Sequence, residues 1–338
     1  MTKFDAFFAS VYWNRYAGID FTQKSLGDPA IQIEHQRRRQ LHCIEKWEIL
    51  GIPICLADKQ NAGTIPAVVS GYGVATISMI FGCKGIFTEG LDPYAESLNL
   101  TDKAIMALTP QTDYSRNPVM QDLESQAAWL VKTHGKACIN INMQSVPNIA
   151  FKLRGDQLMF DFYDNPEIVH KLLDYVQQSW INIRSYISRI NEKNHCPDDG
   201  GMISLDNCTV ALISPDIYRT YFLPYDIKTA ARYSSIYGVH HCGANMHLFS
   251  DYYGQLGEGI WFDIGYGSDV KSCMSSLKTG EKMPFWSVRY GPAKLRSADP
   301  EEIRRERDVL AACGVDTVLC VGVDPDTPDE NLQALLIP

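Results

Sequence analysis

The sequence lacks any uninterrupted run of about 18 apolar residues, the length that a membrane-spanning helix requires. Residues 1–10 also lack the basic segment and long apolar core of a secretory signal peptide. No Cys-x-x-Cys pair occurs, although the chain contains ten cysteines. We therefore expect a cytoplasmic protein with reduced thiols, most of which are small buried apolar side chains.

The sequence also has no excess of basic over acidic residues. The chain has 31 lysines and arginines against 40 acidic residues, a formal net charge of -9. This balance argues against nonspecific binding to nucleic acid or to an anionic membrane. The one short basic run, Arg37–Arg39, has Glu34 and Glu45 nearby, and we interpret it as a solvated helix face rather than an anion site.

Alternating strands and helices dominate what is present. Several helices are predicted to begin at a capping residue followed by proline, as at Asn165-Pro166, Ser214-Pro215 and Asp299-Pro300. The predicted helices cover residues 4–16, 32–50, 121–133, 166–190, 215–237, 246–256, 269–277 and 300–313, with a last one from 328. The predicted strands cover residues 51–58, 136–142, 200–206, a segment around Val239, 259–264, 283–288 and 316–320.

This alternation predicts parallel strands joined by right-handed helical crossovers. With 338 residues, the best match is an α/β fold, a (β/α)8 TIM-type barrel, forming a single domain over residues 1–338. Residues 1–50 are predicted to form an N-terminal helical extension. An open, doubly wound sheet is the alternative architecture.

Polar residues fall at the predicted carboxyl ends of strands, where the chemistry of a barrel takes place. Asp206 is a candidate catalytic and substrate-binding residue, and Asn142, Asp263 and Arg289 are candidate substrate-binding residues. Each also has a structural interpretation, because a carboxylate or amide can simply fix a loop and an arginine can form an internal ion pair.

A metal site is predicted around His240 and Cys242. Side chains two residues apart on a strand share a face, and an imidazole beside a thiol suits zinc. If the strand that ends at Cys320 meets them, the three residues form a three-ligand zinc site with one open position, as catalytic zinc has. The alternative is a buried histidine with filler thiols, and His241 and His247 are alternative ligands.

Several segments resemble motifs of the uroporphyrinogen decarboxylase superfamily. Residues 238–245 (Gly-Val-His-His-Cys-Gly-Ala-Asn) resemble its "H-x-C-G-N" strand end, and residues 324–332 resemble its closing "PPDTPxENL". Residues 212–225 resemble its "SP…F…PY" helix, and residues 164–167 its "d-x-P-E" helix start. The resemblance covers about residues 130–338 and implies a TIM-type barrel preceded by N-terminal helices.

Within that superfamily, the corrinoid-dependent methyltransferases share His-x-Cys and a distant cysteine with this chain, here Cys320 after the 77 residues 243–319. The resemblance implies a zinc enzyme that moves a methyl group between a corrinoid (cobalamin), carried by a partner corrinoid protein, and a small-molecule donor or acceptor such as a thiol. One feature departs from the family: its Gly-Cys-Gly is here Cys320-Val321-Gly322, and a one-residue shift on a regular strand turns the side chain to the other face.

Two other functions remain open. The first is a metal-free decarboxylase of a tetrapyrrole or similar acid, in which Asp206 would stabilise pyrrole N–H groups. The second is a non-catalytic barrel that binds a corrinoid protein or a ligand. Neither a nucleic acid nor a membrane is expected as a partner.

Overall fold

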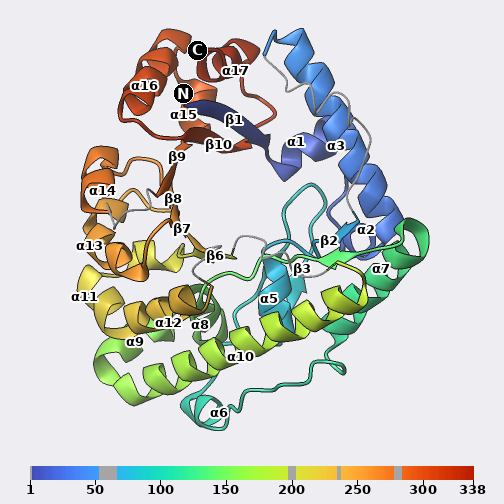
Figure 1. The fold of residues 1–338 in the computed structure, drawn as a ribbon, viewed down its shortest axis with the longest axis vertical. Coiled ribbons are helices and arrows are strands. Elements are labelled where there is room, and N and C mark those ends of the chain that lie inside the picture. The colour runs from blue at the N-terminus through green and yellow to red at the C-terminus, as the bar shows by residue number, and fades with distance from the viewer. Residues whose placement is uncertain (1, 53–66, 197–202, 234–236, 278–283) are drawn as a thin grey trace.

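A sheet of six parallel strands forms the centre of the protein, in the order β1-β10-β9-β8-β7-β6. The computed structural model describes residues 2–52, 67–196, 203–233, 237–277 and 284–338. In Figure 1 these strands curve along the inner side of a ring of helices. The strands are β1 (Lys3–Phe8), β6 (Ile203–Asp206), β7 (Tyr237–His241), β8 (Trp261–Ile264), β9 (Phe285–Tyr290) and β10 (Thr317–Val323).

Two short strand pairs lie outside this sheet. β2 (Val68–Val69) pairs in parallel with β5 (Cys138–Ile139), and β3 (Gly85–Ile86) pairs antiparallel with β4 (Tyr94–Ala95). The predicted α/β class with parallel strands is confirmed, and the arrangement is TIM-like. Among the described residues no pairing closes β6 to β1, so a closed eight-stranded barrel stays a prediction. Most of the predicted strand 51–58 lies outside the described residues.

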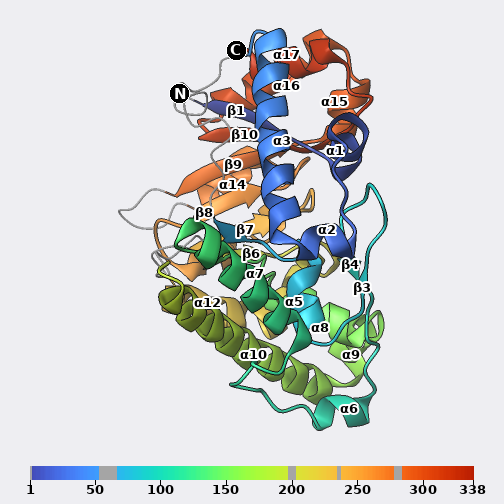
Figure 2. The same cartoon turned by 90° about the vertical axis from the view of Figure 1, so that its right-hand side faces the viewer.

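Helices surround the sheet, and the longest, α3 and α10, are clearest in the side view of Figure 2. No helix among the described residues is both long and apolar enough to cross a bilayer. The α-helices are α1 (Ser10–Ala17), α2 (Gln23–Gly27), α3 (Pro29–Ile49), α5 (Ala75–Ile80), α6 (Asp102–Met106), α7 (Pro118–His134), α8 (Val146–Arg154), α9 (Gln157–Asp164), α10 (Pro166–Lys193), α11 (Pro215–Ile217), α12 (Leu223–Tyr233), α13 (Ser250–Tyr253), α14 (Val270–Ser276), α15 (Pro292–Ser297), α16 (Pro300–Ala312) and α17 (Asp329–Leu336).

The proline-marked helix starts are confirmed. α10 begins at Pro166, α11 at Pro215 and α16 at Pro300. The side chains of Ser214 and Asp299 each accept a hydrogen bond from a backbone N–H of the first turn, which satisfies a group that the helix leaves free. A π-helical turn, η2 (Tyr218–Phe222), separates α11 from α12 within the predicted helix 215–237.

The N-terminal segment is not wholly helical, so the prediction for residues 1–50 is wrong in part. Residues Lys3–Phe8 form β1, which pairs with β10, before α1 begins. Ala6 and Phe8 are buried while Phe7 is exposed, a period of two that suits a strand. The predicted helix 246–256 is also broken, into η3 (Met246–Leu248), α13 and η4 (Gly254–Leu256). Gly254 caps the end of α13, since glycine is a poor helix former.

Candidate metal centre

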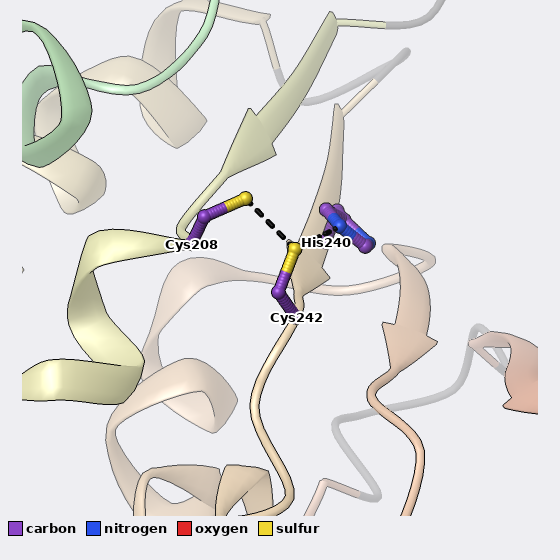
Figure 3. A group of neighbouring side chains, drawn as sticks. All are labelled: Cys208, His240 and Cys242. Carbon is purple, nitrogen blue, oxygen red and sulfur yellow. Dashed lines mark hydrogen bonds between the residues drawn. The ribbon is translucent and has the colours of Figure 1, made fainter. Parts of the chain in front are cut away.

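Strands β6 and β7 end side by side. Asp206, the last residue of β6, is in register with His240 of β7. Cys208 lies two residues beyond the first and Cys242 two residues beyond the second, just past the ends of their strands. Figure 3 shows the two cysteines meeting at this edge, where their sulfurs are 2.8 Å apart.

The imidazole of His240 completes a group of three potential ligands. Its Nε2 lies 2.8 Å from the sulfur of Cys242, and the donor atoms of Cys208, His240 and Cys242 all lie within 4.8 Å of one another. Two sulfurs and one imidazole nitrogen are ligands that zinc prefers. Zinc–sulfur bonds of about 2.3 Å in a tetrahedron would set the sulfurs about 3.8 Å apart. Zinc therefore fits this group after the two thiols separate by about 1 Å.

The other nitrogen of His240 is fixed by Asp263 of β8. Nδ1 lies 2.6 Å from Oδ2 of Asp263, a fully buried residue in register with His240. Burial lowers the pKa of His240, but the hydrogen bonds to Asp263 and Cys208 and the charge of Asp263 outweigh it and raise the pKa to about 9. Without a metal, the ring at neutral pH therefore carries a proton on both nitrogens. Nδ1 faces Asp263, and Nε2, which faces the sulfurs, is the nitrogen that would lose its proton to bind a metal.

Arg289 of β9 contacts the same carboxylate. Its Nε donates to Oδ2 of Asp263 at 2.6 Å, and Nη2 pairs with that oxygen as well. Burial would raise the pKa of Asp263, but the hydrogen bonds from His240 and Arg289 hold it below its usual value. Asp263 is thus a carboxylate that joins the arginine to the imidazole. The predicted substrate-binding roles of Asp263 and Arg289 remain predictions.

The two thiols do not titrate alike. The sulfurs of Cys208 and Cys242 share a hydrogen bond, and this contact, with the imidazole of His240, lowers the pKa of Cys208 to about 5 against the effect of burial. The same contact raises the pKa of Cys242, because its ionisation would place a second anion beside the first, and burial adds to the rise. The pair therefore favours one thiolate, and a divalent cation would favour two.

Cys320 lies elsewhere in the sheet. In the register of β9 and β10, Leu319 is opposite Arg289 and Cys320 is opposite Tyr290. Because Arg289 shares the face of His240, Leu319 occupies that face of β10 and Cys320 the other. Cys320 is fully buried, and burial raises its pKa to about 12. It is not part of the three-residue group, and its role as a ligand stays a prediction.

The candidates Asp206 and Asn142 are placed differently. Asp206 is in register with His240, and its carboxylate accepts a hydrogen bond from Ser204 Oγ at 2.8 Å. The charge of this carboxylate raises the pKa of both site cysteines. Oδ1 of Asn142 accepts from the backbone N of Gln144 at 2.9 Å and so shapes a turn. Their catalytic and substrate-binding roles remain predictions.

The alternative ligands His241 and His247 lie outside the group. The ring of His241 is fully buried, with Nδ1 2.9 Å from the Tyr253 hydroxyl and Nε2 2.9 Å from Oδ1 of Asn245. Burial lowers the pKa of His241 to about 4, so its ring is neutral. Nδ1 of His247 accepts from the backbone N of Asp269 at 3.4 Å.

A buried polar network supports the loop that carries Cys208. The preceding residue, Asn207, donates its side-chain amide to Asp226 at 3.0 Å, and Tyr218 donates its hydroxyl to the same oxygen at 2.7 Å. The backbone N of Asn207 donates to the carbonyl of His240 at 2.8 Å. Asp226 is fully buried, which raises its pKa to about 7 against the effect of these two hydrogen bonds.

Backbone packing fixes the position of Cys242. A Cβ added at Gly265, just after β8, would collide with the carbonyl oxygens of Gly243 and His241 and would lie 2.8 Å from the carbonyl carbon of Cys242. Only glycine allows this approach. The backbone that follows β8 therefore packs directly against the end of β7.

Cys208 is the residue that sequence reasoning missed. Its signal is the pattern Asp206-x-Cys208, which matches His240-x-Cys242 on the next strand. The match becomes meaningful once the two strands are known to be neighbours in that register.

Comparison with known proteins supports the fold. No family model matches the sequence, and no curated protein does so either. Among solved structures, the chain is similar to a methyltransferase from Methanosarcina mazei, with a TM-score of 0.59 and 16% sequence identity over 86% of this chain and 88% of that one. The chain therefore shares its fold, over nearly its whole length, with a methyltransferase.

Proposed function

We propose that this protein is a zinc-dependent methyltransferase that transfers a methyl group between a corrinoid and a small molecule, a thiol being the favoured acceptor. One observation carries the proposal: two thiols and an imidazole converge at the carboxyl ends of neighbouring parallel strands. A fold shared with a methyltransferase and the family resemblance of residues 238–245 add support.

The chain's own residues divide the work. Cys208, His240 through Nε2 and Cys242 would bind zinc. Cys320, the third ligand that the sequence predicts, is not part of this group. When bound, zinc supplies a Lewis acid that lowers the pKa of a substrate thiol and leaves its sulfur nucleophilic at neutral pH. Two thiolates and a neutral imidazole balance the charge of the ion, so the substrate sulfur stays electron-rich.

Asp263 keeps the imidazole oriented, and Arg289 compensates the buried carboxylate. Asp206, in register with His240, would bind a polar or cationic part of the substrate. The corrinoid would supply the methyl group. The substrate sulfur would form a bond to that carbon as the carbon–cobalt bond breaks, with the electron pair of the broken bond left on the corrinoid. The thiol proton is released to water.

The test combines metal analysis with an activity assay. We expect about one zinc per chain and formation of a thioether from methylcobalamin and a member of a thiol panel. Cys242→Ser should lose both zinc and turnover, whereas Cys313→Ser, whose thiol donates to the carbonyl of Val309, should keep both. A zinc-free protein that decarboxylates a tetrapyrrole would contradict the proposal. Zinc without any methyl transfer would indicate a binding protein instead.

A further inference from the structure

The contact between Cys208 and Cys242 has chemistry of its own. Their sulfurs are 2.8 Å apart, closer than zinc would set them, and both residues are free cysteines. They follow two neighbouring parallel strands. A disulfide joins its sulfurs at about 2.05 Å, so these two sulfurs need to approach by less than about 1 Å.

A disulfide and a zinc ion exclude each other here. Zinc binding needs both sulfurs as thiolates about 3.8 Å apart, whereas a disulfide joins them at about 2.05 Å and removes both negative charges. Cys242 is exposed, so a small oxidant can reach the pair from solvent. The state of this contact therefore decides whether the three-residue group can bind metal.

We propose that Cys208 and Cys242 form a reversible disulfide that switches the metal centre off under oxidation. The regulatory meaning rests on the function proposed above, whereas the bond itself does not. With hydrogen peroxide, one sulfur displaces hydroxide and becomes a sulfenic acid. The second sulfur attacks it, the S–S bond forms and water leaves. In total, two thiols and one peroxide give one disulfide and two waters, and a dithiol reductant restores both thiols.

The experiment compares metal-stripped and zinc-loaded full-length protein after treatment with hydrogen peroxide. Remaining thiols are alkylated, and the protein is cleaved before aspartate. Cys208 then lies in peptide 206–215 and Cys242 in peptide 226–250, each with no other cysteine. We expect these two peptides to be linked in the stripped protein, to separate after reduction with dithiothreitol and to stay unlinked in the zinc-loaded protein.

Matched variants sharpen the assignment. Cys208→Ser should abolish the linked peptide pair. Cys196→Ser, which changes another half-buried cysteine ahead of β6, should retain the linked pair. The oxidised wild type should fail to take up zinc in a chelator competition and should regain that ability after reduction. Circular dichroism shows whether each variant is folded, and Cys208→Ala replaces Cys208→Ser if the latter is not.

The outcomes separate the two proposals. Unlinked peptides in folded, oxidised wild type, or a Cys242 that ends as a sulfonic acid, would overturn the switch and leave the methyltransferase proposal standing. A linked pair that blocks zinc in a protein without methyl transfer would support the switch and overturn the proposed activity. A linked species that persists in Cys208→Ser would assign the bond to another cysteine and overturn the switch.

Discussion

Nδ1 of His240 lies 2.6 Å from Oδ2 of Asp263, and this contact sets the direction of the imidazole. A carboxylate behind a histidine fixes which nitrogen carries the proton and makes the other a better metal ligand. Arg289 donates to the same carboxylate oxygen, so three neighbouring strands, β7, β8 and β9, contribute to the orientation of one ring.

Replacement of this carboxylate tests its role. Asp263→Asn should lower zinc affinity by about 10- to 100-fold, the usual cost of losing such an outer partner. The measurement is competition with a chromogenic chelator. Asp251→Asn, which changes an exposed carboxylate of α13, serves as the control and should bind zinc as wild type does. Equal affinity in the two variants would contradict an orienting role for Asp263.

The identity of the second thiolate ligand can be decided by two variants. Cys208→Ser should lower zinc affinity by more than about 100-fold, because a direct ligand contributes more than its outer partners. Cys320→Ser should keep zinc and lose about 1 to 3 kcal/mol of unfolding free energy, since it buries a hydroxyl in an apolar position. Zinc titration and urea unfolding measure both effects. The reverse pattern would establish Cys320 as the ligand.

The glycine behind Cys242 provides a test through the backbone. Gly265→Ala should displace the end of β7, because the added methyl group meets the carbonyl oxygens of Gly243 and His241. We expect weaker zinc binding together with a lower melting temperature. Gly27→Ala is the matched control, since its Cβ would lie 3.4 Å from the nearest atom, an ordinary contact. A Gly265→Ala protein with unchanged zinc affinity would show that this packing does not position the site.

Asp226 predicts a pH dependence of stability. Its pKa is about 7 in the folded protein, above the value of about 3.9 for an unfolded chain. Between these two pH values the folded state keeps a proton that the unfolded state has released. The contribution of Asp226 to the free energy of unfolding therefore falls as pH rises from about 4 to 7 and levels off at higher pH. The free energy of unfolding changes by at most about 1.4 kcal/mol per pH unit through this group.

Asp226→Asn removes this titration while keeping an oxygen to accept from Tyr218 and Asn207. Relative to wild type, the variant should gain stability steadily from pH 5 to pH 7, and the gain should level off between pH 7 and pH 8. Urea unfolding at each pH gives the difference. A constant difference across the range would mean that Asp226 is ionised in the folded protein.

Much of the fold could be predicted from the sequence because its signals are local. The prolines at 166, 215 and 300 mark helix starts whatever the rest of the chain does. β1 has no such signal: its pairing with β10 joins residues more than 300 positions apart, and six residues rich in phenylalanine suit a helix equally well. Tertiary pairing, rather than local preference, makes this segment a strand.

The same distinction separates the predicted site residues from the missed one. His240 lies on β7 and Cys242 directly follows it, so strand spacing alone predicts that the two side chains share a face. Cys208 joins them through the register of β6 with β7, which one strand's sequence does not contain. The placement of Cys320 likewise depends on whether residue 319 or 320 faces Arg289, a choice that the register of β9 with β10 makes.

The pairing of β1 with β10 also has a consequence for biosynthesis. A ribosome adds about 5 to 20 residues per second, so roughly 15 to 60 s separate the synthesis of β1 from that of β10. During that time the edge of β1 that later binds β10 has no partner strand, and Phe7 and Phe8 are available for intermolecular association. We expect the yield of native protein to depend on chaperones that shield this segment until translation ends.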